Sequence, residues 1–365
     1  MSKARQLADL GNVYDDGALS HRRMTYNGAM NVWQRGTSAD TASNNDYMCD
    51  RWQVSFSGLD GNVDWDQETS STPDGFANAL KVSIDASETS LDAGDRIQVQ
   101  QPLEGQDLQH IMKGTSSAKK LTVSFWVRSS VASTYTLELE DADNARFANK
   151  TYTVDTADTW EYKTIVFDGD TTGTFGNDNG ASLYVTFWLD AGTNFTGGTF
   201  QSDWAAKASD KRIYDTTGWL ESTSPTFYIT GVQLEVGDTA TPFEHRSYGD
   251  ELARCQRYYE EVFMTGGNFI GYYASAPNRF YFPAIHYETR KRTSPTASFS
   301  TSNSYMVISG TVGVEASGQQ SGFSLYATSD VLGVTKLRAN GGGTPSSGYS
   351  YNWEPDIRFY LDAEL

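Results

Sequence analysis

The fold class is indicated most directly by two stretches, KLTVSFWVRSS at Lys120–Ser130 and SLYVTFWLDAG at Ser182–Gly192. In both, apolar residues alternate with polar ones, so an extended strand has one apolar and one polar face. The FW pair of each stretch places its two rings on opposite faces of the strand. The pattern predicts antiparallel strands whose apolar faces cover one another.

Six more segments between residues 24 and 248 show a comparable pattern. They are Arg51–Ser57, Asn78–Asp85, Asp95–Leu103, Thr134–Ala142, Trp160–Gly169 and Thr226–Gly237. Eight strands with turn-rich connections indicate two packed antiparallel sheets, and an antiparallel jelly-roll β-sandwich over residues 24–248 is the prediction. The composition agrees, because a chain with 21 Tyr, 18 Phe and 33 Gly favours strands and turns over helices.

One helical segment follows the predicted sandwich. Good helix formers run from Glu251 to Phe263, and Gly249 and Asp250 can start the helix, with Asp250 as the expected N-cap. Its apolar residues lie near helical spacing: Leu252, Cys255, Tyr259, Val262 and Phe263. We therefore expect one amphipathic helix, residues 249–263, that links two domains.

The remainder, residues 264–365, is expected to be a second and smaller β domain, which makes the chain all-β. Its predicted strands are Asn268–Ser275, Arg279–Thr289, Pro295–Thr301, Tyr305–Gly310, Gly322–Thr328, Gly333–Ala339 and Asp356–Leu365. No internal repeat is present that would indicate a solenoid or a propeller.

The first residues, 1–23, lack core material of their own. The segment KARQLADL can form two helical turns with Leu7 and Leu10 on one side, but so short a helix is not stable alone in water. Two interpretations follow: the segment is disordered, or it docks on another chain as an attachment arm.

The net charge of −18 is unevenly distributed, since residues 24–248 hold 32 acidic and 15 basic residues. An acidic surface repels nucleic acid and anionic membranes, which argues against both as partners. No apolar run is long enough for membrane insertion, and the N-terminus has no apolar core of a secretion signal. Solubility explains the charge, with capture of divalent cations as the alternative.

Neither the cysteines nor any catalytic motif indicates an enzymatic activity. Cys49 and Cys255 form no CxxC motif, and free buried thiols are expected rather than a disulfide. HExxH, GxSxG, Walker and GxGxxG motifs are absent. Carboxylate pairs such as Asp141/Asp143 or Asp64/Asp66 arise by chance among 46 acidic residues. We expect no enzymatic activity.

A structural calcium ion is the one cofactor that the sequence suggests, and none is required. Asp141–Lys150 and Asp168–Gly180 are rich in oxygen donors of the kind that calcium binds. The candidate ligands are Asp141, Asp143, Asp168 and Asp170. Ordinary turns rich in Asp, Asn and Gly are the alternative.

Aromatic side chains are the candidates for sugar binding, because a pyranose ring stacks on a flat aromatic face. Trp126, Trp160 and Trp188 are predicted to face outward and form one platform; packing between subunits or under loops is the alternative. A rival platform lies in the second domain, in the loop Gly341–Trp353. Its candidate residues are Tyr349, Tyr351 and Trp353.

Several motifs together resemble a known family. They are YNGAMNVWQRGTS followed by CDRW, then TFYITGVQLEVGDTATPFEHRSYGDELARCQRYYEE, YFPAIHYETRKRTSPT, and the terminal LDAEL. In this combination the chain is similar to tailed-phage virion proteins, common among phages of aquatic bacteria. These are described as tail-fibre or receptor-binding proteins with a jelly roll like that of carbohydrate-binding modules. The resemblance covers most of residues 24–296.

The resemblance implies a non-enzymatic role in the virion, often as a homotrimer. Applied to this chain, it implies that residues 1–23 attach to other tail proteins and that residues 264–365 are distal and receptor-binding. The expected function is attachment to a host-surface glycan. A purely structural virion component and a glycan depolymerase are the alternatives. The shared motifs themselves predict a structural joint, formed by Arg246, Asp250, Glu251, Arg257 and Tyr258.

Overall fold

The computed structural model describes one long continuous part of the chain and several shorter parts. These are residues 22–264, 272–273, 279–281, 285–299, 305–310, 315–316, 324–329, 334–340, 349–354 and 357–365. Most of the predicted arm, residues 1–21, lies outside this description. The chain divides into two compact units: the first ends at Glu251 and takes in Leu365, and the second runs from Leu252 to Glu364. No helix among the described residues is long and apolar enough to cross a membrane.

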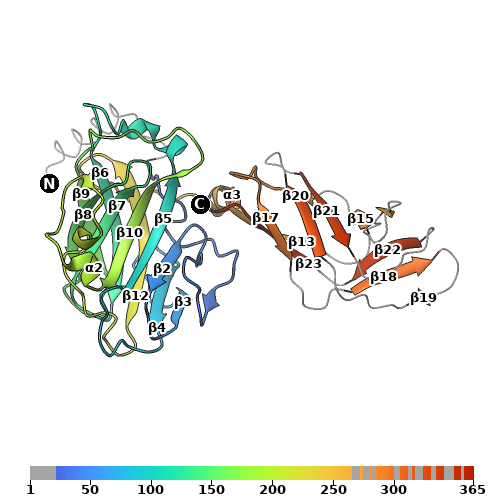
Figure 1. The fold of residues 1–365 in the computed structure, drawn as a ribbon, viewed down its shortest axis with the longest axis horizontal. Coiled ribbons are helices and arrows are strands. Elements are labelled where there is room, and N and C mark those ends of the chain that lie inside the picture. Colours follow the sequence, from blue (N-terminus) through green and yellow to red (C-terminus); the bar gives the residue numbers. More distant parts are fainter. Residues whose placement is uncertain are drawn as a thin grey trace. The chain divides into compact units, whose positions relative to one another are not determined.

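The first unit is a jelly-roll β-sandwich of two six-stranded antiparallel sheets (Figure 1). The first sheet has the order β1 (Ser38–Ala39), β3 (Val63–Glu68), β4 (Ala79–Ile84), β12 (Thr226–Val236), β6 (Leu121–Ser129), β9 (Glu161–Phe167). The second has the order β11 (Ala205–Ala206), β8 (Arg146–Thr153), β7 (Thr134–Asp141), β10 (Ala181–Ala191), β5 (Arg96–Glu104), β2 (Gln53–Ser57). The predicted fold class is confirmed.

The core lies between the two sheets and follows the alternation in sequence. Phe125 of β6 meets Phe187 of β10 edge to face, with ring centroids 4.9 Å apart, and both side chains are fully buried. Trp52 packs on Phe187 at 6.2 Å. Burial of aromatic residues of this size provides much of the stability of a sandwich that has few leucines. Cys49 also belongs to the buried set and carries a free thiol, as expected.

All eight predicted strands of the sandwich are present, but two long strands were missed. β3 (VDWDQE) and β8 (RFANKTYT) contain charged or amide side chains on both faces, which hides their period-two pattern. β8 replaces part of the oxygen-rich loop that was expected at Asp141–Lys150, so that interpretation was wrong from Arg146 onward.

Short helices interrupt the connections between strands. They are η1 (Gly105–Asp107), η2 (Gln109–Ile111), α2 (Thr193–Thr196) and η3 (Ser209–Lys211). The connection that contains α2 and η3, residues 192–213, runs across the outer face of the second sheet. It is tied there by Asn149, whose side-chain amide donates to the carbonyl oxygens of Gln201 and Lys211.

The linking helix is shorter than predicted. α3 spans Tyr248–Gln256, and the backbone N–H of Asp250 donates to the hydroxyl of Ser247 at 3.2 Å. Ser247 is therefore the N-cap, and Asp250 lies in the first turn. Residues after the helix form a strand, β13 (Tyr259–Met264), which pairs with the C-terminal β23. Tertiary pairing thus overrides the helical pattern of residues 259–263.

The second unit is also built from antiparallel sheets. One has the order β13, β23 (Ile357–Asp362), β17 (Thr296–Phe299). A second sheet contains β14 (Tyr272–Tyr273), β15 (Arg279–Tyr281), β21 (Val334–Asn340), β16 (Ile285–His286) and β20 (Ser324–Ser329). A third has the order β19 (Glu315–Ala316), β18 (Tyr305–Gly310), β22 (Tyr349–Glu354). Residues 264–365 were predicted to be β, and these strands agree with that prediction.

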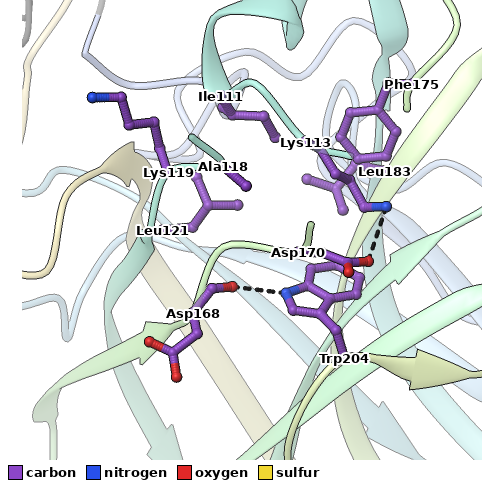
Figure 2. Close-up of a pocket in the computed structure, with 10 residues that line it drawn as sticks. All are labelled: Ile111, Lys113, Ala118, Lys119, Leu121, Asp168, Asp170, Phe175, Leu183 and Trp204. Carbon is purple, nitrogen blue, oxygen red and sulfur yellow. Dashed lines mark hydrogen bonds and ion pairs between the residues drawn. The ribbon is translucent and has the colours of Figure 1, made fainter. Parts of the chain in front are cut away.

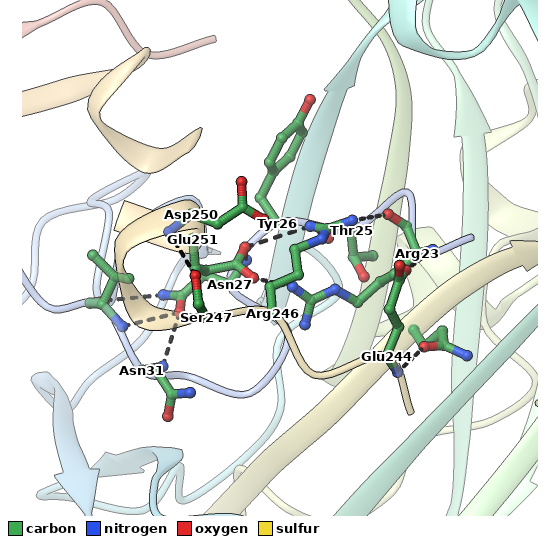
Figure 3. A network of polar contacts seen from close by, with 12 residues as sticks. Arg23, Thr25, Tyr26, Asn27, Asn31, Glu244, Arg246, Ser247, Asp250 and Glu251 are labelled. Atoms are coloured by element: carbon green, nitrogen blue, oxygen red, sulfur yellow. Dashed lines mark hydrogen bonds and ion pairs between the residues drawn. The ribbon is translucent and has the colours of Figure 1, made fainter. Parts of the chain in front are cut away.

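A buried carboxylate links the N-terminal and C-terminal chain segments of the first unit (Figure 3). Glu251 of α3 forms an ion pair with Arg23, and the two side chains are only 6% and 1% exposed. Glu251 also accepts a 2.6 Å hydrogen bond from the backbone N–H of Asn27 and lies 3.6 Å from the guanidinium of Arg246. Arg246 in turn donates to the carbonyl oxygen of Arg23. Arg23 is therefore part of the sandwich.

The other predicted joint residues lie in the second unit or at its start. The backbone of Arg257 accepts a hydrogen bond from Arg292 at 2.9 Å, and that of Tyr258 accepts one from Ala363 at 2.7 Å. Tyr258 is fully buried. Beside it, Lys291 pairs with Glu260 in a buried ion pair. Arg246 and Glu251 thus act in the first unit, while Arg257 and Tyr258 anchor the second.

The Glu251→Gln substitution should destabilise the first unit strongly. It removes the charge that compensates Arg23 and leaves a guanidinium buried without a counter-ion, a change that costs about 3–5 kcal/mol in comparable buried pairs. Chemical denaturation followed by tryptophan fluorescence measures the loss. The matched control is Glu221→Gln, because Glu221 is exposed. Equal stability of the two variants would contradict a central role for the pair.

Candidate functional site

Two of the predicted tryptophans lie on the outer face of the first sheet. Trp126 of β6 is half-buried, and its ring lies 5.4 Å from that of Tyr162, which is 47% exposed. Trp160 is also half-buried, and its ring lies near that of Tyr228. The guanidinium of Arg128 lies 5.3 Å from the ring of Trp160 and 3.8 Å from the ring of Tyr228. We call these five residues the aromatic face. The predicted outward orientation of Trp126 is found.

The polar groups of the aromatic face are bonded within the protein. The indole N–H of Trp160 donates to the carbonyl oxygen of Ser71 at 2.8 Å. Arg128 donates to the hydroxyl of Ser71 at 2.7 Å and lies 3.6 Å from Glu68. This face offers flat rings, and the indole N–H of Trp160 and one terminal nitrogen of Arg128 have acceptors, whereas the Nε of Arg128 has none among the described residues. Glycan binding by Trp126 and Trp160 stays a prediction.

Trp188 does not face solvent, so the predicted three-tryptophan platform is wrong. Trp188 lies on the opposite sheet from Trp126 and is fully buried. It does point away from the core, as alternation requires, but the connection 192–213 covers it. Ile213 and the ring of Phe195 pack on it, and the guanidinium of Arg212 lies 4.9 Å from its ring.

The rival platform of the second unit is placed on a strand. Tyr349, Tyr351 and Trp353 belong to β22, which pairs with β18. They had been assigned to a loop, and that assignment was wrong, because the alternation in YSYNWE favours sheet pairing.

The predicted calcium ligands surround a lysine. Asp141 and Asp170 do come together, but the ammonium group of Lys113 lies between them, 2.5 Å from Asp141 and 3.0 Å from Asp170. Figure 2 shows the ion pair of Lys113 with Asp170. Lys113 also donates to the carbonyl oxygens of Thr172 and Gly173, at 2.9 Å each. This buried ammonium thus has the carboxylate and carbonyl neighbours that had been expected around an ion.

The remaining two aspartates do not complete a metal site. Asp143 accepts a hydrogen bond from the backbone of Gly176 at 2.8 Å. Asp168 is exposed and pairs with Lys120 at 3.1 Å. Within the described part of the chain, no group of three or more His, Cys, Asp or Glu side chains is arranged to hold a metal ion. The four-aspartate calcium site is corrected to a lysine-centred charge cluster.

The most distinctive polar surface lies on the outer face of the second sheet. Gln98 and Gln100 of β5 stand beside Ser55 and Gln53 of β2, and Thr186 of β10 lies next to Gln100. We call these five residues the amide face. Outward-facing side chains of a sheet are usually well exposed, yet Gln98 is 5% and Gln53 8% exposed. Such low exposure means that neighbouring side chains and loops surround these amides.

The amides of this face form a directional chain of hydrogen bonds. Gln98 donates to Gln100 at 2.9 Å, Gln100 donates to Gln53 at 2.6 Å, and Gln53 donates to the carbonyl oxygen of Asn45 at 2.9 Å. The chain begins at Gln98, whose side-chain oxygen is buried and has no hydrogen-bond partner among the described residues. The neighbouring indole N–H of Trp188 also lacks one. An unpaired acceptor and an unpaired donor thus lie on adjacent strands.

A charged cluster borders the amide face. Glu138 and Glu140 of β7 point to the same side, and Arg212 binds both, with its Nε 2.8 Å from Glu138. Lys207 also pairs with Glu140. Burial raises the pKa of Glu138, and its bonds to Arg212 offset that effect in part. Because one guanidinium holds both carboxylates, the pair serves to fix Arg212 rather than to transfer protons.

The sequence itself contains a signal for this surface. QVQQ at residues 98–101 alternates amides with a core valine, and Gln98 and Gln100 therefore share a face. The partners Gln53, Ser55 and Thr186 come from distant segments, and only the sheet register brings them to the same place.

Comparisons with known proteins give distant matches of structure alone. No family model matches the sequence, and no curated protein matches it. The enzymatically active domain of tailspike protein 4 of bacteriophage CBA120 is 12% identical, with a TM-score of 0.32; the match covers 59% of this chain and 22% of that one. The module TmCBM61, solved in complex with β-1,4-galactotriose, is 11% identical with a TM-score of 0.30, over 59% of this chain and 99% of the module.

A third match is to the N-terminal cellulose-binding domain of β-1,4-glucanase C from Cellulomonas fimi. It is 13% identical with a TM-score of 0.28, over 56% of this chain and 97% of that domain. All three matches are too distant to assign an activity or a ligand to this chain.

The Lys113 cluster should make stability depend on pH. Burial alone would raise the pKa of Asp170, but hydrogen bonds from Arg146 and Lys113 outweigh it and lower that pKa below its usual value. A carboxyl group whose pKa is lowered in the folded protein stabilises the fold at pH values above its pKa in the unfolded chain, which is about 3.9. This stabilisation is lost as the pH falls through the pKa of the folded state. Urea unfolding of Asp170→Asn should therefore change less with pH than the wild type below about pH 4. The exposed Asp74→Asn should behave like the wild type.

Removal of divalent ions should leave the first unit intact. Because the Lys113 ammonium already neutralises Asp141 and Asp170, neither calcium at millimolar concentration nor a chelator should move the thermal midpoint of the full chain. Differential scanning calorimetry in both conditions measures this. A midpoint that rises with calcium and falls with chelator would show that an ion binds elsewhere and stabilises the fold.

Proposed function

We propose that this chain is a non-catalytic protein of a tailed-phage virion that attaches to a glycan on the host surface through the amide face. The observation that carries the proposal is the chain of side-chain amides on β5 and β2, which ends in an unpaired oxygen at Gln98. Sugar hydroxyl groups both donate and accept hydrogen bonds. They match a surface that presents amide oxygens, amide N–H groups and a threonine hydroxyl.

The amide face suits a glycan better than the aromatic face does. Rings alone provide stacking, but a polyhydroxylated ligand loses hydrogen bonds to water unless the protein replaces them. On the aromatic face the groups of Arg128 and Trp160 are already bonded to Ser71. On the amide face, the side-chain oxygen of Gln98 has no partner among the described residues. The two faces belong to opposite sheets, so they can be tested separately.

The assignment to a virion rests on the motifs that the chain shares with tail-fibre proteins. Several of their residues close the sandwich: Asn27 donates to the carbonyl oxygens of Val32 and Asp50, and Trp33 stacks on Trp65 at 6.0 Å. Within this proposal, residues 1–23 attach the chain to other tail proteins and three copies assemble. Residues 264–365, with Tyr349, Tyr351 and Trp353, are a further candidate for host contact.

Titration of glycans against single variants of the full chain tests the binding face. A glycan array first identifies an oligosaccharide that binds, and isothermal calorimetry then compares variants. Gln100→Ala removes the central amide and should weaken binding at least about tenfold, which is the effect of one or two lost hydrogen bonds. Gln67→Ala is the matched control, because Gln67 lies on β3 of the other sheet and also bonds to a neighbour, Asn78.

Trp126→Ala separates the two faces in the same experiment. If it abolishes binding while Gln100→Ala does not, the glycan binds to the aromatic face and the amide face is only structural. If no glycan of the host surface binds to the wild type, a purely structural role in the virion replaces the proposal. Electron microscopy of the virion, with the chain located in the density, tests its place in the particle.

A further inference from the structure

The end of the amide face nearest Trp188 carries an arginine without a counter-ion. Arg96 of β5 lies on the same side of the strand as Gln98 and Gln100, two and four residues away. Its guanidinium contacts the ring of Phe195 at 5.7 Å from the centroid. Within the described part of the chain it makes no hydrogen bond and no ion pair. A guanidinium has five donors, and none of those on Arg96 has an acceptor among the described residues.

The absence of a partner is unusual for an arginine of this domain. Residues 24–248 hold more than twice as many acidic as basic residues, so counter-ions are abundant. Arg96 is half-buried, and burial and the nearby Arg212 lower its pKa, while the carboxylate of Glu140 offsets part of that effect. Its charge is therefore held in a place that disfavours it. An anion bound at Arg96 would relieve this cost.

The charges around Arg96 favour such an anion. Glu138 and Glu140 are the nearest carboxylates of the bordering cluster, and both are engaged by Arg212, with Lys207 on Glu140 as well. Counting Arg96, this cluster has three cations and two anions.

We infer that Arg96 makes the amide face selective for glycans that carry an anionic substituent, namely a carboxylate, sulfate or phosphate group. This rests on the proposed function. The anionic group binds to the guanidinium of Arg96, and hydroxyl groups of the same ligand reach the amides of Gln98 and Gln100. Residues two apart on a strand are about 7 Å apart, so the three side chains form a row that fits adjacent groups of an oligosaccharide. Planar anions accept two parallel hydrogen bonds from arginine, which adds specificity to charge.

The test compares pairs of oligosaccharides that differ in charge alone. The probes are an oligogalacturonate and its neutral galactan counterpart, a sulfated galactan and its desulfated form, and a phosphorylated mannan with its dephosphorylated form. The full-length wild type should bind one acidic member at least tenfold more tightly than its neutral counterpart, and more weakly as salt rises. The three pairs tell carboxylate, sulfate and phosphate apart.

Two variants of Arg96 separate charge from packing. Arg96→Met keeps an apolar side chain against Phe195 but has no donor, and it should lose about tenfold to a hundredfold in affinity for the acidic ligand. Its affinity for the neutral counterpart should change less than twofold. Arg96→Lys keeps the charge but not the paired geometry, and should retain part of the selectivity. Both should unfold at the wild-type temperature, since Arg96 makes no ion pair with the described residues.

The outcomes distinguish this inference from the proposed function. If the wild type binds neutral and acidic members equally, or if Arg96→Met weakens both equally, selectivity by Arg96 is overturned while glycan binding by the amide face stands. Suppose that Gln100→Ala abolishes binding of the acidic and the neutral oligosaccharide, and that Arg96→Met abolishes binding of the acidic one alone. This result supports the proposed function and the inference. If no member of any pair binds, the proposed function fails and the inference fails with it.

Discussion

The buried carboxylate of Glu251 is the constraint that closes the first unit. It neutralises Arg23 at the start of the described chain and accepts a hydrogen bond from the backbone of Asn27, more than two hundred residues away in sequence. A charge buried this deeply is stable only when its partner is fixed, so both ends of the sandwich are held together. Consequently the chain enters and leaves the first unit at the same place.

The two outer faces of the sandwich differ in how their polar side chains are hydrogen-bonded within the protein. On the aromatic face, Arg128 lies between two rings and donates to Ser71, and only its Nε has no acceptor among the described residues. On the amide face, every glutamine orients the next one, but the first of them, Gln98, has an oxygen without a donor. A buried unpaired oxygen costs free energy, and a ligand that supplies a donor recovers it. The same type of strand thus yields two different surfaces.

Charge inside this acidic domain is organised around a few basic residues. Lys113 holds Asp141 and Asp170 together, and Arg212 holds Glu138 and Glu140. In each cluster one cation fixes two carboxylates that would otherwise repel each other. Arg96 differs, because none of the described carboxylates pairs with it. This contrast with Lys113 and Arg212, which are both paired, makes Arg96 the candidate for binding an anionic group of a ligand.

The sequence by itself determined the sandwich and the identity of its core. Alternation of apolar and polar residues depends only on the geometry of an extended strand, and therefore all eight strands expected in residues 24–248 are present. The aromatic residues predicted to be inside, such as Phe125 and Phe187, are buried. The sequence also indicated correctly that Cys49 and Cys255 are buried and form no disulfide with each other.

Only the tertiary structure decided what covers each outward-facing residue. Trp188 has the same local sequence pattern as Trp126, yet the connection 192–213 buries Trp188. Trp126, on the other sheet, is only half-buried. Asp141 and Asp170 meet as expected, but Lys113, distant from both in sequence, takes the position of an ion. Gln98 and Gln53 become neighbours through the pairing of β5 with β2. Such contacts depend on register and on loops that cross a sheet, and no local pattern encodes them.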